Sequence, residues 1–172
     1  MLRKIFPASL LLFLLGCAST YNMTNIFDKE EVSWINQDGS STITGQAFLN
    51  QQGGGVVTCA GKEVSLIPVT NYSSERMQAI YGSTEQGYKS HGWLTTDVLF
   101  TPSTPAEFFT SQKKATCDAQ GNFKFKEVPS GKEYFVLTKV RWIVSDVEQG
   151  GDLMLKTTSK ENEITEIILT QQ

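Results

Sequence analysis

The sequence predicts an all-β sandwich of about seven strands, and three observations support this fold class. Short β-prone runs alternate between apolar and polar side chains, as between Ile43 and Leu49, which is typical of strands buried on one face. Turns rich in glycine or proline, such as residues 51–55 and 128–131, separate these runs at regular spacing. One long stretch, residues 71–116, breaks the pattern and is expected to be an insert carrying one or two short helices.

The segments with the composition of strands are, in chain order, residues 31–35, 42–49, 56–60, 63–69, 123–125, 134–144, 153–155 and 164–170. The first of them contains Trp34. Phe123 and Phe125 alternate with lysines, which predicts a strand with one wet face. Residues 134–144 are apolar on both faces near Val136, as expected of a central strand. Residues 149–152 include two glycines and are expected to turn the chain.

Residues 1–16 have the pattern of a secretory signal peptide. Arg3 and Lys4 come first, and the apolar run from Ile5 to Leu15 is too short to cross a membrane, which takes about 20 residues. The run ends in Leu14-Leu15-Gly16-Cys17, which resembles the lipobox of bacterial lipoproteins. The resemblance implies a lipid on the Cys17 sulfur, cleavage before Cys17, and acylation of the new amino terminus. The alternative is an ordinary secretory signal in which Cys17 is incidental.

We therefore expect a protein of the bacterial cell envelope, held on the lipid bilayer through acylated Cys17. Ala18 and Ser19 follow, with no aspartate at the second position. By analogy with enterobacterial sorting, this favours the outer membrane, facing the periplasm, over the inner membrane. Residues 17–28 are expected to be a tether, and residues 29–172 the sandwich domain with its insert.

The charge of the exported chain argues against nucleic acid as a partner. Without Arg3 and Lys4, 13 of the 15 basic residues remain against 18 acidic ones, a net charge near −5. No basic patch that could follow a phosphate backbone is present in the sequence.

Cys59 and Cys117 are the cysteines that remain once Cys17 carries lipid. An even remainder in an exported domain favours a disulfide, which would close a loop of 58 residues and stabilise the fold by about 4 kcal/mol at most. The alternatives are a zinc site and a free reactive thiol. Zinc is disfavoured because there is no Cys-x-x-Cys pair and only one histidine, His91. We expect neither a metal nor a cofactor.

Two blocks of the sequence resemble a carboxypeptidase-regulatory-like domain. The first joins Gly45-Gln46-Ala47-Phe48 to residues 61–68, and the second joins Asp118-Ala119-Gln120-Gly121-Asn122-Phe123-Lys124-Phe125 to residues 128–131 and Tyr134. The resemblance implies a prealbumin-like (transthyretin-like) sandwich. That family carries no activity of its own, so the resemblance supports a fold and not a reaction. The sequence departs from the family in having Lys132 and Glu133 where one residue is usual, and in the long segment between the blocks.

The insert is where a function is expected, since a long insertion in a compact domain is usually functional or disordered and this one is too aromatic for disorder. Met77, Ile80 and Tyr81 have helical spacing, and residues 82–91 look like a loop. Thr104-Pro105-Ala106-Glu107 has the form of a capping box, which would open a second short helix. Lys113 and Lys114 would suit the C-terminal end of that helix. Its aromatic side chains either cover an open end of the sandwich or form a partner surface. The candidate partner-surface residues are Tyr72, Tyr81, Tyr88, Trp93, Phe108 and Phe109.

No catalytic set stands out, and we expect no enzyme. Ser90, His91 and Asp97 are residue types of a hydrolase triad, but neighbours on a strand point to opposite faces and no nucleophile elbow accompanies them. The expected function is that of a non-catalytic envelope lipoprotein that presents its sandwich to a protein partner or to envelope assembly. The alternative is a small-ligand binder or enzyme that uses the aromatic insert and His91.

Overall fold

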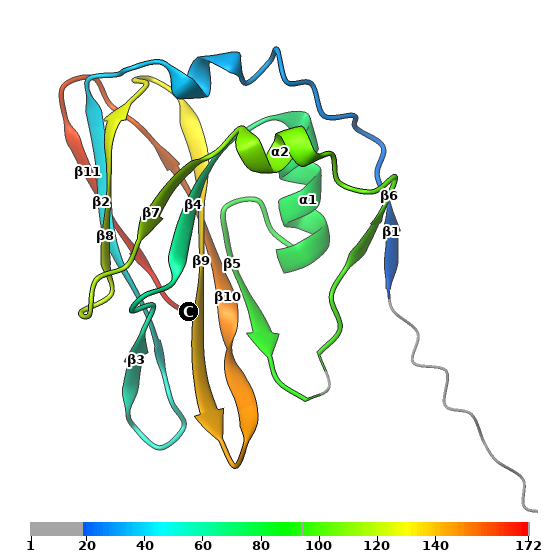
Figure 1. The fold of residues 1–172 in the computed structure, drawn as a ribbon, viewed down its shortest axis with the longest axis vertical. Coiled ribbons are helices and arrows are strands. Elements are labelled where there is room, and N and C mark those ends of the chain that lie inside the picture. The colour runs from blue at the N-terminus through cyan, green and yellow to red at the C-terminus, as the bar shows by residue number, and fades with distance from the viewer. Residues whose placement is uncertain (1–18, 94, 172) are drawn as a thin grey trace, which may run out of the picture.

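The computed structural model describes residues 19–93 and 95–171. The predicted signal peptide and the lipidation site at Cys17 therefore lie outside the described residues. Two β-sheets pack face to face, and two short helices lie on the outer side of one sheet (Figure 1). The predicted all-β sandwich with a helix-bearing insert is confirmed.

The larger sheet has five strands in the order β5-β10-β9-β4-β7. The strands are β4 (Glu63–Pro68), β5 (Gln86–His91), β7 (Lys113–Thr116), β9 (Glu133–Val144) and β10 (Val147–Thr158). Every pairing in this sheet is antiparallel. The long hairpin of β9 and β10 forms its centre, so the prediction of a central strand over 134–144 is confirmed.

The second sheet is built around β2 (Ser41–Asn50). Its other strands are β3 (Val56–Thr58), β8 (Asn122–Val128) and β11 (Ile164–Leu169). β3 and β8 pair antiparallel with β2, whereas the last strand, β11, runs parallel to it. The parallel pairing returns the end of the chain to the strand that began the sandwich.

The main core lies between the two sheets and uses the alternation seen in the sequence. One sheet contributes Ile43, Leu49, Phe123, Phe125 and Leu169, and the other Val64, Leu66, Val136, Val140 and Leu153. All of these side chains are at least 97 % buried, so the inward-facing positions inferred for 123–125 are confirmed.

Three predicted elements are wrong. Residues 31–35 are not a strand: Ser33–Asn36 form a 3₁₀ turn that buries Ile35 and sets Trp34 edge-on against Tyr134. Residues 86–91, expected as a loop, form β5. The glycines at 149–152 lie inside β10, and the chain turns instead at Ser145 and Asp146, which both have positive φ. A two-residue hairpin turn of this kind needs left-handed backbone at both positions.

Gly150 and Gly151 are glycines because the backbone is approached closely there. A Cβ at Gly151 would lie 2.0 Å from the Tyr88 ring, and one at Gly150 would lie 2.0 Å from the Val140 carbonyl oxygen. The Tyr88 hydroxyl donates to the Gly150 carbonyl at 3.1 Å. These glycines therefore make room for a neighbour in the sheet and do not bend the chain.

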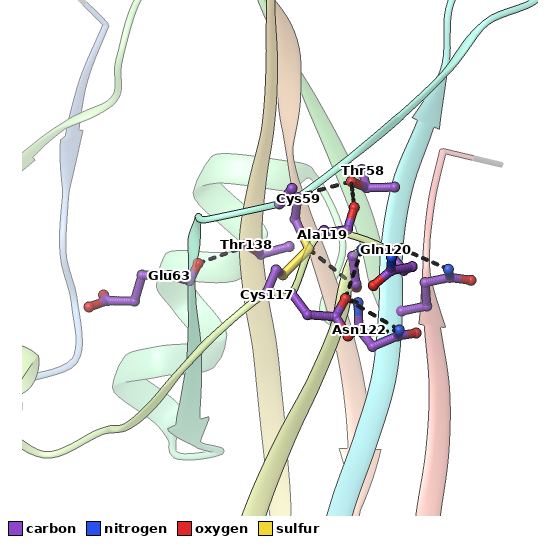
Figure 2. Close-up of a disulfide and its surroundings, with 12 residues drawn as sticks. Thr58, Cys59, Glu63, Cys117, Ala119, Gln120, Asn122 and Thr138 are labelled. Atoms are coloured by element: carbon purple, nitrogen blue, oxygen red, sulfur yellow. Dashed lines mark hydrogen bonds between the residues drawn. A yellow bond between two sulfur atoms is a disulfide. The ribbon is translucent and has the colours of Figure 1, made fainter.

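The predicted disulfide between Cys59 and Cys117 is present (Figure 2). Both residues are buried in the main core, and their Cα atoms are 5.8 Å apart. The loop that the bond closes contains the whole insert. The bond joins the residue after β3 to the residue after β7, so β4 and the insert both lie inside the loop.

The segment predicted as a tether belongs to the folded domain from Ser19 onward. Thr20–Asn22 form β1, which pairs in parallel with β6 (Leu99–Thr101). Met23 and Phe27 then pack against buried side chains of the insert. Positions 21, 23, 25 and 27 are half-buried and alternate with exposed neighbours, although the composition of the segment is polar overall.

Candidate functional site

The insert covers the outer face of the five-stranded sheet. It contains α1 (Asn71–Tyr81) and α2 (Ala106–Thr110) together with β5 and β6, and Figure 1 shows both helices on the side of this sheet away from β2. A second core lies between insert and sheet and consists of Ile67, Tyr72, Met77, Phe108, Phe135 and Met154.

Local sequence explains where α1 begins and ends. Thr70 caps it, accepting from the Ser73 backbone while the Ser73 hydroxyl accepts from the Thr70 backbone. Gly82 ends the helix in a left-handed conformation. The predicted helix over 72–81 is confirmed.

The second predicted helix is shorter than expected. α2 has five residues and lacks the predicted capping box. The Thr104 hydroxyl accepts a hydrogen bond from Arg76 at 2.7 Å instead. Lys113 and Lys114 are not at the C-terminal end of the helix, because they belong to strand β7.

A cleft of about 790 Å³ lies between the insert and the sheet. Ile67, Leu137 and Asp152 contribute to its floor, on strands β4, β9 and β10. Its roof and walls come from the insert and include Met77, Ile80, Phe100, Phe108 and Phe109. The volume is in the range of small-molecule sites, which are typically apolar with a few placed polar groups.

Arg76 is the unusual residue of this cleft. Its side chain lines the cavity although the residue is only 8 % exposed. The guanidinium carbon lies 3.9 Å from the Phe100 ring centroid and 4.9 Å from that of Phe108. Burial lowers the pKa of Arg76, while the nearby Tyr72 opposes that shift. The guanidinium is thus held in an aromatic cage, a geometry that stabilises a cation.

The hydrogen-bonding capacity of Arg76 is only partly used. Its Nη1 donates to Thr104, but the buried Nε has no acceptor, and the buried Tyr72 hydroxyl beside it has no hydrogen-bond partner. Within the described residues, no carboxylate lies within 4.0 Å of the guanidinium. A buried cation usually has an acidic partner, so this one is an exception.

Further charged side chains line the cleft, and most of them are paired. Lys114 contacts Glu63 at 2.9 Å, and Lys89 contacts Asp97 at 3.3 Å. Asp152 pairs with Arg141 from the adjoining strand. The lining cations Lys62 and Lys139 have no carboxylate partner in the described part of the chain. The unpaired charge of the cleft is therefore positive.

Tyr81 is a further polar group of the cleft wall. Burial raises the pKa of this tyrosine, and the neighbouring Asp152 raises it further. The phenol is protonated at neutral pH, as tyrosines ordinarily are, and can serve as a hydrogen-bond donor.

Glu75 joins the N-terminal segment to α1. Its carboxylate accepts from the backbone N–H groups and side chains of Thr24 and Asn25 at 2.8 Å. Desolvation raises the pKa of Glu75, but these four hydrogen bonds outweigh it and lower the pKa to about 2. The N-terminal segment is thereby fixed beside the helix that carries Arg76.

The six aromatic residues predicted as a partner surface do not form one continuous exposed surface. Tyr72 and Phe108 are buried, Tyr81 is half-buried in the cleft wall, and Tyr88 packs against the main core. Trp93 and Phe109 are exposed, at 86 % and 52 %. Most of these rings therefore shape the second core and the cleft.

His91 is not part of the cleft. It lies on β5 and contacts Glu148 at 3.2 Å, while Asp97 is almost fully exposed and pairs with Lys89. Ser90 pairs with Gly151 of β10 and is the neighbour of His91 on β5. Adjacent strand residues point to opposite faces of the sheet. The three residue types of a triad are thus not assembled as one site.

In residues 19–93 and 95–171, no cluster of three or more histidine, cysteine or acidic side chains could hold a metal ion. Over the same residues, no helix is long and apolar enough to cross a membrane.

Sequence reasoning did not single out Arg76. A signal was present, because Tyr72 and Arg76 are four residues apart and share the helix face that also carries Met77 and Ile80. An arginine on the apolar face of a helix is a candidate for a specific role.

No protein-family model matches the chain, and no curated protein matches it. Among solved structures, the chain is similar to a "putative carbohydrate binding protein" from Pseudomonas aeruginosa. The two share 23 % sequence identity with a TM-score of 0.68, over 84 % of this chain and 97 % of the other. At this identity the similarity shows a common fold.

Proposed function

We propose that the protein is a non-catalytic binding protein of the bacterial envelope, anchored by lipid on Cys17, whose site is the cleft between the insert and the five-stranded sheet. The observation that carries this proposal is the cleft itself: about 790 Å³, walled by aromatic and aliphatic side chains and containing a caged arginine. A preformed cavity with few, convergent polar groups is the usual form of a small-molecule site.

The sequence led us to expect a surface for a protein partner, whereas the proposed site binds a small ligand. The aromatic rings of the insert are used mainly to enclose space, which favours a small ligand over a flat protein interface. His91 is not expected to contact the small ligand, because it does not line the cleft. The fold shared with the Pseudomonas protein makes saccharides a ligand class to screen first.

A binding screen with a matched pair of variants tests the site. Phe109 and Ile143 are both exposed apolar residues, at 52 % and 64 %, but only Phe109 lines the cleft. For a ligand found by calorimetry, we expect Phe109→Ala to weaken binding about tenfold, as for a lost buried aromatic contact, and Ile143→Ala to leave it unchanged. Equal effects of both substitutions would exclude the cleft as the site.

A protein partner is the second candidate, favoured by the exposure of Trp93. In-cell crosslinking followed by mass spectrometry should then recover one dominant envelope protein. That recovery should be lost with Trp93→Ala and retained with Phe109→Ala.

A further inference from the structure

The unsatisfied guanidinium in the cleft indicates what kind of ligand it accepts. We infer that Arg76 binds the acidic group of a small organic anion whose apolar or sugar body fills the cleft. This inference rests on the proposed function, because it specifies the ligand of the same cleft.

The first support is the missing counter-charge. Arg76 is 92 % buried by residue area and has Nε without an acceptor, although charged groups taken out of water are normally paired. The aromatic cage of Phe100, Phe108 and Tyr72 compensates part of the desolvation, but rings accept no strong hydrogen bond from the guanidinium edge. An oxyanion in the cleft would supply the missing counter-charge and accept from Nη2, which has no hydrogen-bond partner among the described residues and is not among the fully buried unpaired atoms.

The second support is the charge balance of the lining. Each of the three carboxylates there, Glu63, Asp97 and Asp152, already has a cationic partner. Arg76, Lys62 and Lys139 are the lining cations left without one among the described residues. The chain as a whole is negative, at −3, so this local excess of positive charge is opposite to the overall charge.

The third support is the placing of Arg76 by its neighbours. The Thr104 hydroxyl accepts from Nη1, and the guanidinium carbon lies over the Phe100 ring, 3.9 Å from its centroid. Both neighbours come from the segment that follows β5, whereas Arg76 is on α1. The donor group is therefore fixed before a ligand arrives, which reduces the entropy lost on binding.

A pair of fluorescent probes of similar shape tests the inference. Anilinonaphthalene sulfonate carries an anionic group, whereas phenylnaphthylamine has a similar aromatic body and is neutral. The exported full chain with Cys17→Ser is used, so that binding is measured without detergent. We expect the anionic probe to bind at least tenfold more tightly than the neutral one, as for a charge-assisted hydrogen bond in a water-poor site.

Three substitutions in that chain locate the effect. Arg76→Gln keeps a donor for Thr104 but removes the charge, and it should abolish the preference for the anion, so that the two probes bind with similar affinity. Arg76→Lys should restore part of the preference. Lys132→Gln removes a cation that lies over Trp34, away from the cleft, and should change neither affinity.

The outcomes separate failure of the inference from failure of the proposed function. Equal affinity of the two probes in the chain with Arg76 would overturn the inference even if Arg76→Gln did not fold. An equal loss of preference in Arg76→Gln and Lys132→Gln would overturn it as well. If Phe109→Ala affects neither probe, the cleft is not a binding site, and the proposed function fails with the inference.

Competition then identifies the body of the anion. Glucuronate and decanoate are compared with glucose and decanol, each pair differing chiefly in the acid group. Displacement of the anionic probe by glucuronate alone would indicate an acidic sugar, and by decanoate alone an apolar acid. Displacement by the neutral partners as effectively as by the acids, or by neither acid, would contradict a site for carboxylates.

Discussion

At the scale of single residues, glycine positions show how closely this fold is packed. Gly151 lies under the Tyr88 ring, and Gly87 lies against Tyr81, where an added Cβ would meet the Tyr81 side chain at 2.4 Å. The first contact joins the insert to the central hairpin, and the second joins α1 to β5 within the insert. A methyl group at either position would push apart elements that also form the cleft wall.

We expect Gly151→Ala to lower the free energy of unfolding by about 1–3 kcal/mol, because overpacking forces the Tyr88 ring out of place. Urea unfolding followed by tryptophan fluorescence measures this change. Gly53→Ala is the control, since nothing lies within 4 Å of an added Cβ there, and it should change stability by less than about 0.5 kcal/mol. A similar effect of both substitutions would contradict the contact.

At the scale of elements, the N-terminal segment is joined to α1 through Glu75. The pKa of this carboxyl falls from 4.5 to about 2 on folding. The stabilisation is therefore fully present above pH 4.5 and is lost as the pH falls towards 2. The contact matters for the cleft, because the same segment pairs through β1 with β6.

Glu75→Gln should therefore destabilise the protein at pH 6, and the difference from the unsubstituted chain should shrink as the pH approaches 2. Amide exchange at Thr24 and Asn25 should speed up in this variant, since both N–H groups lose their carboxylate acceptor. Glu161→Gln, at an exposed residue, should show neither effect. A pH-independent difference would show that the carboxylate charge is not what holds the segment.

The disulfide is the covalent connection between elements on either side of the insert. Removing it with Cys59→Ala and Cys117→Ala should lower the free energy of unfolding by about 2–4 kcal/mol, because the open chain gains loop entropy when it unfolds. Denaturant titration measures the loss, and reduction of the original chain should shift its electrophoretic mobility. No mobility shift would contradict the bond.

The elements also show where sequence reasoning succeeds and where it stops. The strands bearing Ile43, Phe123 and Val136 were predictable, because alternation and apolar runs record burial directly. β5 was not, since Gly87 and His91 give it a loop-like composition and its pairing with β10 is a long-range choice. For the same reason the glycines of β10 resemble a turn although they make room for Tyr88. The disulfide followed from counting cysteines, whereas the cage around Arg76 depends on Phe100, which is distant in sequence.

At the scale of the whole molecule, the described residues form a two-layer sandwich with a third layer made by the insert (Figure 1). Two cores share the five-stranded sheet, which is buried from both sides near Phe135 and Met154. A substitution in the insert is therefore expected to alter the packing of the five-stranded sheet. The same sheet, packed on both faces, forms one wall of the cleft.

The proposed lipid anchor gives a prediction for the intact protein. Cys17→Ser should move the protein from the membrane fraction to the soluble fraction of the envelope and abolish labelling with a fatty acid, because the thiol is the group that receives the lipid. Cell fractionation and metabolic labelling measure both effects. Cys117→Ser in the same cells is the control and should leave both the fraction and the label unchanged. Labelling that persists in Cys17→Ser would exclude this cysteine as the acceptor.

The pairing of Thr20–Asn22 with β6 has a consequence for how such an anchored domain would stand on a bilayer. The Ser19 carbonyl accepts from the Leu99 backbone, so only Ala18 would lie between that contact and a lipidated Cys17, and the two Cα–Cα steps would span about 7 Å at most. An extended tether over residues 17–28 would instead span about 40 Å. The domain would then lie close to the lipid headgroups. Its cleft would be accessible to molecules near the membrane surface more than to molecules elsewhere in the periplasm.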